Sequence, residues 1–103
     1  MEVNITTKGD SRVVKLIGRL DTVASPDVTK ALEPVIEDAT GTIILDCSEM
    51  TYISSSGLRI FLTLRKASLA KGGKVIVRSI NNDIRTVFMM TGFLNLFTIE
   101  DLF

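Results

Sequence analysis

The sequence predicts an α/β fold, with helices alternating along the chain with strands of a mostly parallel or mixed sheet. Segments rich in Val and Ile alternate with segments of helical periodicity, and turn residues fall between them. The length of 103 residues and the hydrophobic fraction of 46% suit one folded domain. We therefore predict a single domain over residues 1–103, without a linker, in the order β-β-α-β-α-β-α-β. Four or five strands and three or four helices are expected.

The first two strands are predicted to form a hairpin. Val3 and Ile5 alternate with polar residues, residues 8–11 suit a turn, and residues 12–18 are rich in β-branched side chains. The later strands are separated by helices, which favours parallel pairing through right-handed crossovers.

The first helix is expected to begin at Ser25, which can cap it, with Pro26 and Asp27 in its first turn. Pro34 is expected to kink this helix or weaken its middle because proline lacks a backbone donor. The helix should end at residues 40–41. Its predicted apolar face consists of Val28, Ala31, Leu32, Val35, Ile36 and Ala39.

Residues 42–47 form an apolar run without alternation, which predicts a central strand covered by other elements. Residues 48–53 are expected to connect this strand to a second helix, from about Ser56 to Ala70. Basic and glycine residues at 71–73 should end that helix. The residues predicted to lie on one side of it are Leu58, Phe61, Leu62, Arg65 and Leu69.

The last third of the chain predicts a strand, a helix and a strand. Residues 74–78 suit a strand, and residues 81–83 can cap a third helix that stops at Gly92. Residues 97–99 are expected to form the last strand. The predicted face of the third helix consists of Ile84, Val87, Phe88 and Thr91.

Composition argues against several function classes. Lys plus Arg and Asp plus Glu number 12 each, so the chain lacks the basic charge of nucleic-acid-binding proteins. With no histidine, neither a Ser-His-Asp or Cys-His arrangement nor a histidine-bearing zinc site can form within it. Cys47 is the only cysteine, so an internal disulfide is excluded, and it should pack in the buried strand. We expect no enzyme activity, no catalytic residue and no metal site.

No apolar run reaches the ~20 residues that a helix needs to cross a bilayer. The first residues lack the basic and then apolar pattern of a signal peptide. We therefore expect a cytoplasmic protein that does not insert into membranes.

A run of three serines, Ser54 to Ser56, stands at the predicted start of the second helix. A helix N-terminus carries unpaired N–H groups and about half a positive charge, which suits an anion, including one attached to serine. Phosphorylation would add about −1.5 to −2 charge, which the fold should tolerate but a partner packed there would not. From the residues alone, a capping cluster and a modification or binding site both stay open.

The segment Ser55-Ser56-Gly57-Leu58 resembles the signature of STAS-domain anti-sigma factor antagonists, in which Asp-Ser-Ser/Thr-Gly-Leu opens the second helix. Residues 18–21 (Gly-Arg-Leu-Asp), 72–73 (Gly-Gly) and 87–93 resemble further segments of that family, so the resemblance covers nearly the whole chain. It implies a single STAS-like domain. The sequence departs from the family pattern at two places. Ser54 stands where the family has aspartate, and the family's final helix is either absent or begins within residues 100–103.

The resemblance implies an anti-sigma factor antagonist. Unphosphorylated, it would bind an anti-sigma factor that is also a serine kinase; phosphorylated on Ser55, or on neighbouring Ser54 or Ser56, it would release that partner. A metal-dependent serine phosphatase would reset the switch. ATP would be used by the kinase, so this chain itself needs no cofactor. The implied partner-binding residues are Asp21, Ser54, Ser55, Ser56, Gly57, Leu58 and Arg59.

Alternatives remain open at the level of sequence. Asp21 could simply order its turn, Asp46 could face the same surface or only end its strand, and Arg59 could pair with a phosphoserine, contact an acidic partner or face solvent. Similar domains also serve as accessory or scaffold subunits of transporters and stress-signalling complexes. A nucleotide-binding domain is a further alternative, although neither Gly-x-x-x-x-Gly-Lys-Ser/Thr nor Gly-x-Gly-x-x-Gly is present.

Overall fold

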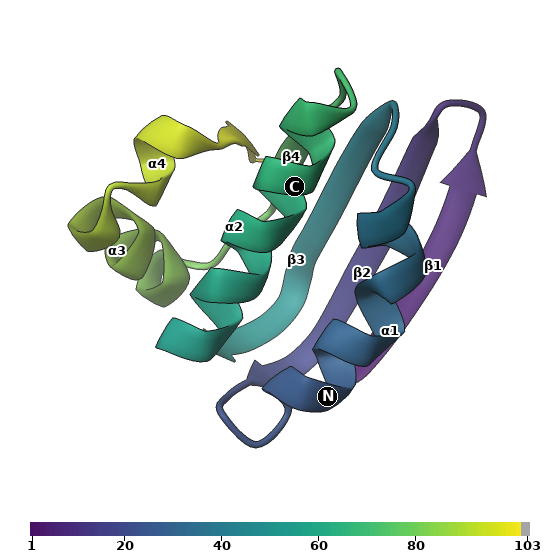
Figure 1. The fold of residues 1–103 in the computed structure, drawn as a ribbon. Coiled ribbons are helices and arrows are strands. Elements are labelled where there is room, and N and C mark those ends of the chain that lie inside the picture. The colour runs from purple at the N-terminus through teal and green to yellow at the C-terminus, as the bar shows by residue number, and fades with distance from the viewer. Residues whose placement is uncertain (102–103) are drawn as a thin grey trace.

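A computed structural model describes residues 1–101. Within them, five strands form one sheet in the order β1-β2-β3-β4-β5 (Figure 1). Strands β1 and β2 are antiparallel, and each later neighbouring pair is parallel. The predicted mixed α/β sheet is confirmed, with a short fourth helix inserted before the last strand. The elements are β1 Glu2–Lys8, β2 Ser11–Leu20, α1 Ser25–Glu37, β3 Thr42–Ile53, α2 Ser55–Ala70, β4 Lys74–Arg78, α3 Asn82–Thr91, α4 Phe93–Leu96 and β5 Thr98–Glu100.

The hydrophobic core lies between the sheet and the helices. Figure 1 shows α1 and α2 side by side across one face of the sheet, with α3 and α4 beyond α2. Leu16, Leu45 and Val77 face this core from three adjacent strands. The Phe61 ring of α2 meets the Phe88 ring of α3 edge-on, with 6.0 Å between ring centroids, which joins the two halves of the helical layer.

The opposite face of the sheet carries charged side chains in register. Lys15, Asp46 and Arg78 are neighbours on β2, β3 and β4, and Arg78 forms an ion pair with Glu100 of β5 at 3.1 Å. Side chains alternate between faces along a strand, so Asp46 points away from the helices while Leu45 points toward them.

Strand β3 is longer than predicted. Residues 48–53, expected to be a connecting segment, continue the strand and pair with β2 as far as Leu20 opposite Ile53. The pairing shifts register between Lys15 and Ile17 and again between Gly18 and Arg19. These irregularities explain the error, because bulges break the two-residue alternation from which strands are recognised.

The first helix differs from prediction at both ends. Its N-cap is Ala24, without a side-chain cap, so the predicted capping by Ser25 is wrong. The helix continues through Pro34 and ends at Glu37, short of the predicted end at residues 40–41.

The buried face of α2 is rotated from the predicted one. Leu62 is 39% exposed and Leu69 is 56% exposed, although both were predicted to share one side of the helix with Phe61, which is fully buried. The buried residues are Gly57, Ile60, Phe61, Leu64 and Ser68.

Glu100 belongs to β5, so it does not start a further helix. The rest of the helix considered for residues 100–103 includes Leu102 and Phe103, which lie outside the described residues. Within residues 1–101, no helix has both the length and the apolarity that a bilayer crossing requires.

Candidate functional site

The serine run opens α2 at the carboxyl end of β3. Ser54 is the N-cap in an extended conformation, with φ −91° and ψ 173°, and its Oγ accepts the N–H of Gly57 at 3.2 Å. Its own N–H donates to the carbonyl oxygen of Leu20 at 2.9 Å, and its side chain is buried. The Ser54 hydroxyl therefore caps the helix, and the cap is tied to the end of β2.

The next three residues differ sharply in accessibility. Ser55 is exposed, Ser56 is half-buried and Gly57 is buried. A Cβ at residue 57 would lie 2.7 Å from Leu20 Cγ and 2.9 Å from Ile53 Cγ1. Glycine is therefore needed for the first turn of α2 to pack this closely on the sheet, and that packing leaves Ser55 outside.

Asp21 orders the turn that precedes α1. Its Oδ1 accepts the N–H of Ala24 at 2.8 Å, and its carbonyl oxygen accepts both the N–H and the Oγ–H of Ser25 at 3.0 and 2.8 Å. Since Leu20, the preceding residue, binds the Ser54 N–H, Asp21 lies at the same end of the sheet as the serine run.

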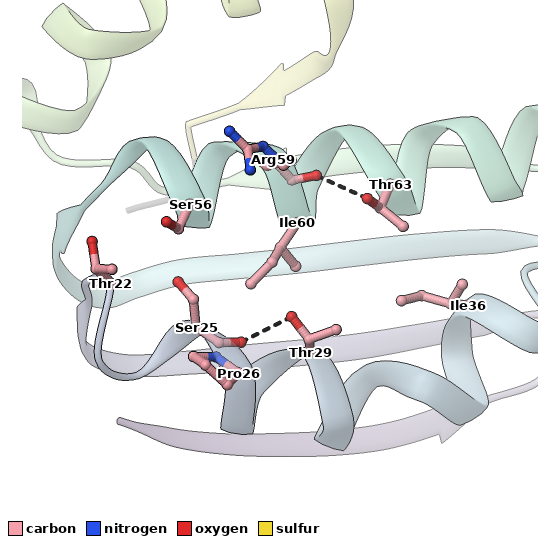
Figure 2. A pocket seen from close by; sticks show the side chains of 9 residues that line it. All are labelled: Thr22, Ser25, Pro26, Thr29, Ile36, Ser56, Arg59, Ile60 and Thr63. Atoms are coloured by element: carbon pink, nitrogen blue, oxygen red, sulfur yellow. Dashed lines mark hydrogen bonds between the residues drawn. The ribbon is translucent and has the colours of Figure 1, made fainter.

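An open groove lies between α1 and α2 beside the serine run (Figure 2). Its volume is about 440 Å³. In Figure 2 the side chains of Ser25 and Ser56 lie at one end of the space between the helices, and Ile36 and Ile60 point into it farther along. The lining residues are Thr22, Ser25, Pro26, Thr29, Ile36, Ser56, Arg59, Ile60 and Thr63.

Among the described residues, Arg59 is the only charged one that lines this groove. It is exposed, and within residues 1–101 its guanidinium has neither a hydrogen-bond nor an ion-pair partner. The first turn of α2 carries no acidic residue. The positive end of this helix and Arg59 therefore lie unneutralised beside Ser55.

The structure thus brings most predicted site residues together. Asp21 and the segment Ser54–Arg59 share one end of the sheet, with Leu58 half-buried against the core. Asp46 does not join them, and the idea that it ends its strand is wrong. It lies within β3 on the opposite face of the sheet, where its Oδ1 accepts the N–H of Ser48 at 3.0 Å.

Cys47 is buried, as predicted, with 1% of its surface exposed. Burial and, to a lesser extent, the nearby Asp46 carboxylate raise the pKa of its thiol well above the ordinary range, so the group stays protonated. Across residues 1–101, no group of three or more His, Cys, Asp or Glu side chains could hold a metal ion.

The groove was not predicted from the sequence. Thr29 and Thr63 each stand four positions after a residue whose carbonyl oxygen their hydroxyl binds, Ser25 and Arg59. The sequence carries no signal for these contacts, and only the fold shows that the two helices are neighbours.

Known proteins resemble this chain in sequence and in fold. An anti-sigma-B factor antagonist of Staphylococcus aureus is 25% identical over 101 residues, covering 98% of this chain and 94% of that protein. A Thermotoga maritima protein, proposed to be an anti-sigma factor antagonist, has the same fold with a TM-score of 0.89 at 18% identity, covering 97% of this chain and 86% of that one.

The anti-sigma factor antagonist SpoIIAA also has this fold. Its unphosphorylated form matches with a TM-score of 0.76 at 21% identity, covering 99% of this chain and 90% of that chain. The phosphorylated form from Bacillus matches with a TM-score of 0.77 at 23% identity, covering 99% and 92%. The family model of the STAS domain matches residues 2–102, and the chain therefore belongs to the STAS domain family.

Proposed function

We propose that this chain is an anti-sigma factor antagonist, a binding module without catalytic activity of its own, whose partner is an anti-sigma factor that is also a serine kinase. The unphosphorylated chain binds this partner in the cytoplasm, and phosphorylation of Ser55 releases it. The kinase uses ATP, and a metal-dependent serine phosphatase restores the free hydroxyl. The observation that carries the proposal is the exposed Ser55 at the first position of α2, directly after a buried cap.

Accessibility favours Ser55 over its neighbours as the phosphoacceptor. A kinase must reach the hydroxyl, and the Ser54 hydroxyl is buried and accepts the Gly57 N–H. Ser56 is half-buried and lines the groove beside α1. Ser55 alone of the three is exposed.

The family aspartate at residue 54 is not required for capping, since the Ser54 hydroxyl caps α2. A neutral cap leaves the helix dipole free to stabilise the added phosphate.

The switch acts on the partner and leaves the fold intact. At the start of α2 the phosphate meets the positive end of the helix, so the folded domain tolerates it. A partner packed over Ser55 must strip water from that charge. A penalty of about 3 kcal/mol weakens binding roughly a hundredfold.

The test is titration calorimetry with the anti-sigma factor kinase encoded nearest to this gene. We expect Ser55→Ala to bind like the wild type and Ser55→Asp to bind roughly a hundredfold more weakly. Asn82→Asp, which places the same new charge at the first position of α3, is the matched control and should bind like the wild type. Equal affinity of Ser55→Asp and the wild type would overturn the proposal.

The descriptions of the related proteins support the role of an anti-sigma factor antagonist. The S. aureus protein is an antagonist of an anti-sigma factor, and SpoIIAA occurs in phosphorylated and unphosphorylated forms on the same fold.

A further inference from the structure

We propose that the groove between α1 and α2 receives a segment of the anti-sigma factor that carries an apolar side chain next to a carboxylate, and that Arg59 binds this carboxylate. The phosphate on Ser55 then competes with this carboxylate for the Arg59 guanidinium and so weakens the contact with the partner. This inference rests on the proposed function and specifies which contacts phosphorylation breaks.

The groove and the serine motif form one continuous surface. Ser56 of the motif and Arg59, which directly follows the motif, both line the groove. The exposed Ser55 precedes Ser56 and lies one helical turn before Arg59 on α2. A partner that covers Ser55 therefore reaches the groove mouth without crossing any other element.

The middle of the groove suits an apolar side chain. Ile60 and Ile36 point into it from α2 and α1 (Figure 2). The Thr29 and Thr63 hydroxyls donate to carbonyl oxygens of their own helices, at 2.8 and 3.0 Å, so their hydrogens are already used. An apolar group from a partner would remove apolar surface from water here without stripping a free donor.

The positive charge of Arg59 at the rim of the groove indicates which polar group the partner segment should carry. Within residues 1–101, Arg59 is the sole charged lining residue, no acidic side chain lines the groove, and the guanidinium has no hydrogen-bond or ion-pair partner. A carboxylate is the group that a guanidinium binds with two parallel hydrogen bonds. A partner segment with a carboxylate at this rim would gain affinity and a fixed orientation.

The spacing of Ser55 and Arg59 couples this contact to phosphorylation. The two exposed residues are four positions apart on α2, with the acceptor serine on the N-terminal side. An acidic group four positions before a basic one is the favourable arrangement of a helical ion pair. Phosphorylated Ser55 therefore offers Arg59 a partner within the same helix and competes with the carboxylate of the anti-sigma factor.

Two pairs of variants test the inference by calorimetry with the same kinase. Thr63→Trp fills the groove, and Thr86→Trp is its control, an exposed threonine on α3 whose hydroxyl bonds to the carbonyl oxygen of Asn82 at the same 3.0 Å. Arg59→Glu reverses the rim charge, and Lys66→Glu makes the same change on α2 at an exposed residue outside the groove.

We expect Thr63→Trp and Arg59→Glu each to weaken binding at least tenfold and both controls to stay within twofold of the wild type. Arg59→Gln should also shrink the difference in affinity between phosphorylated and unphosphorylated chain. Thermal melts check folding, and Thr29→Trp fills the groove from α1 if Thr63→Trp is unstable.

Wild-type affinity in the groove and rim variants would overturn the inference, while the loss of binding in Ser55→Asp would leave the proposed function standing. A groove variant that changes self-association but not kinase binding would assign the groove to a second copy of the chain and also overturn it. Failure of the wild type to bind the kinase would overturn both proposals.

Discussion

The N-termini of α2 and α3 share one design and differ in the residues after the cap. Both helices start at the carboxyl ends of adjacent parallel strands, β3 and β4. In each, a polar N-cap in extended conformation accepts the N–H three residues later, Ser54 from Gly57 at 3.2 Å and Asn81 from Ile84 at 2.8 Å. Beyond the cap, α3 has the acidic Asp83 in its first turn and α2 has no acidic residue there.

This difference separates a structural helix start from one suited to regulation. In α3 the positive end of the helix is matched by Asp83, and the third residue, Ile84, is buried in the core. In α2 the first two residues are serines and the third is glycine. No acidic side chain neutralises the positive end of this helix, which is therefore available to a phosphate that is added and removed. Two neighbouring helix starts of similar geometry therefore offer an internal control for the proposed switch.

The largest expected difference concerns the third residue of each helix. Ile84→Ala should lower the free energy of unfolding by about 2–5 kcal/mol because it leaves a cavity in the core. Gly57→Ala should lower it by about 1–3 kcal/mol for the opposite reason, since the new Cβ would meet Leu20 and Ile53. Urea denaturation of both variants measures the effects. A neutral Gly57→Ala would contradict the close packing of α2 on the sheet.

The caps should show a smaller difference in the same direction. Ser54→Ala should cost about 1 kcal/mol of stability because the Gly57 N–H loses its acceptor. Asn81→Ala should cost more, because Asn81 Nδ2 also donates to the carbonyl oxygen of Met50 at 3.3 Å. Denaturant midpoints measured under one set of conditions give the comparison. Ser54→Asp, which keeps an acceptor at the cap, should keep wild-type stability, and a large loss in that variant would contradict the capping role.

The smallest effect is that of a new charge on stability. Ser55→Asp should stabilise the fold by about 0.3–1 kcal/mol at low salt, since it meets an unmatched helix N-terminus. Asn82→Asp should gain less, because Asp83 already occupies that turn of α3. Thermal melts at low and high salt separate the two, and salt should abolish the gain of Ser55→Asp. An equal gain in both variants would remove the distinction between the helix starts.

Local patterns predicted the elements, and long-range packing decided what they missed. The β-branched runs and helical periodicities located all five strands and the three longer helices of the described residues, but not the short α4. The serine motif by itself pointed to the start of α2. The end of β3 was missed because its inward residues Cys47, Met50 and Ile53 recur at intervals of three across register shifts. The α2 face was misjudged because two of its buried positions, Gly57 and Ser68, carry no large apolar side chain and so do not stand out in a hydrophobic pattern.

The groove required more than a better local pattern. Its lining comes from two helices that are separated in sequence by the whole of β3 and meet only in the folded domain. For the same reason, the isolation of Arg59 could not be inferred from the sequence, because a side chain from any neighbouring element could have paired with it.

The most direct test of the central claim is site-resolved mass spectrometry of the chain after incubation with ATP and the anti-sigma factor kinase encoded nearest to its gene. We predict a single phosphate on Ser55 in the wild type and none in Ser55→Ala, with Asn82 variants modified like the wild type. Phosphate on the buried Ser54 or on Ser56, or continued modification of Ser55→Ala, would contradict the assignment of Ser55 as the switch.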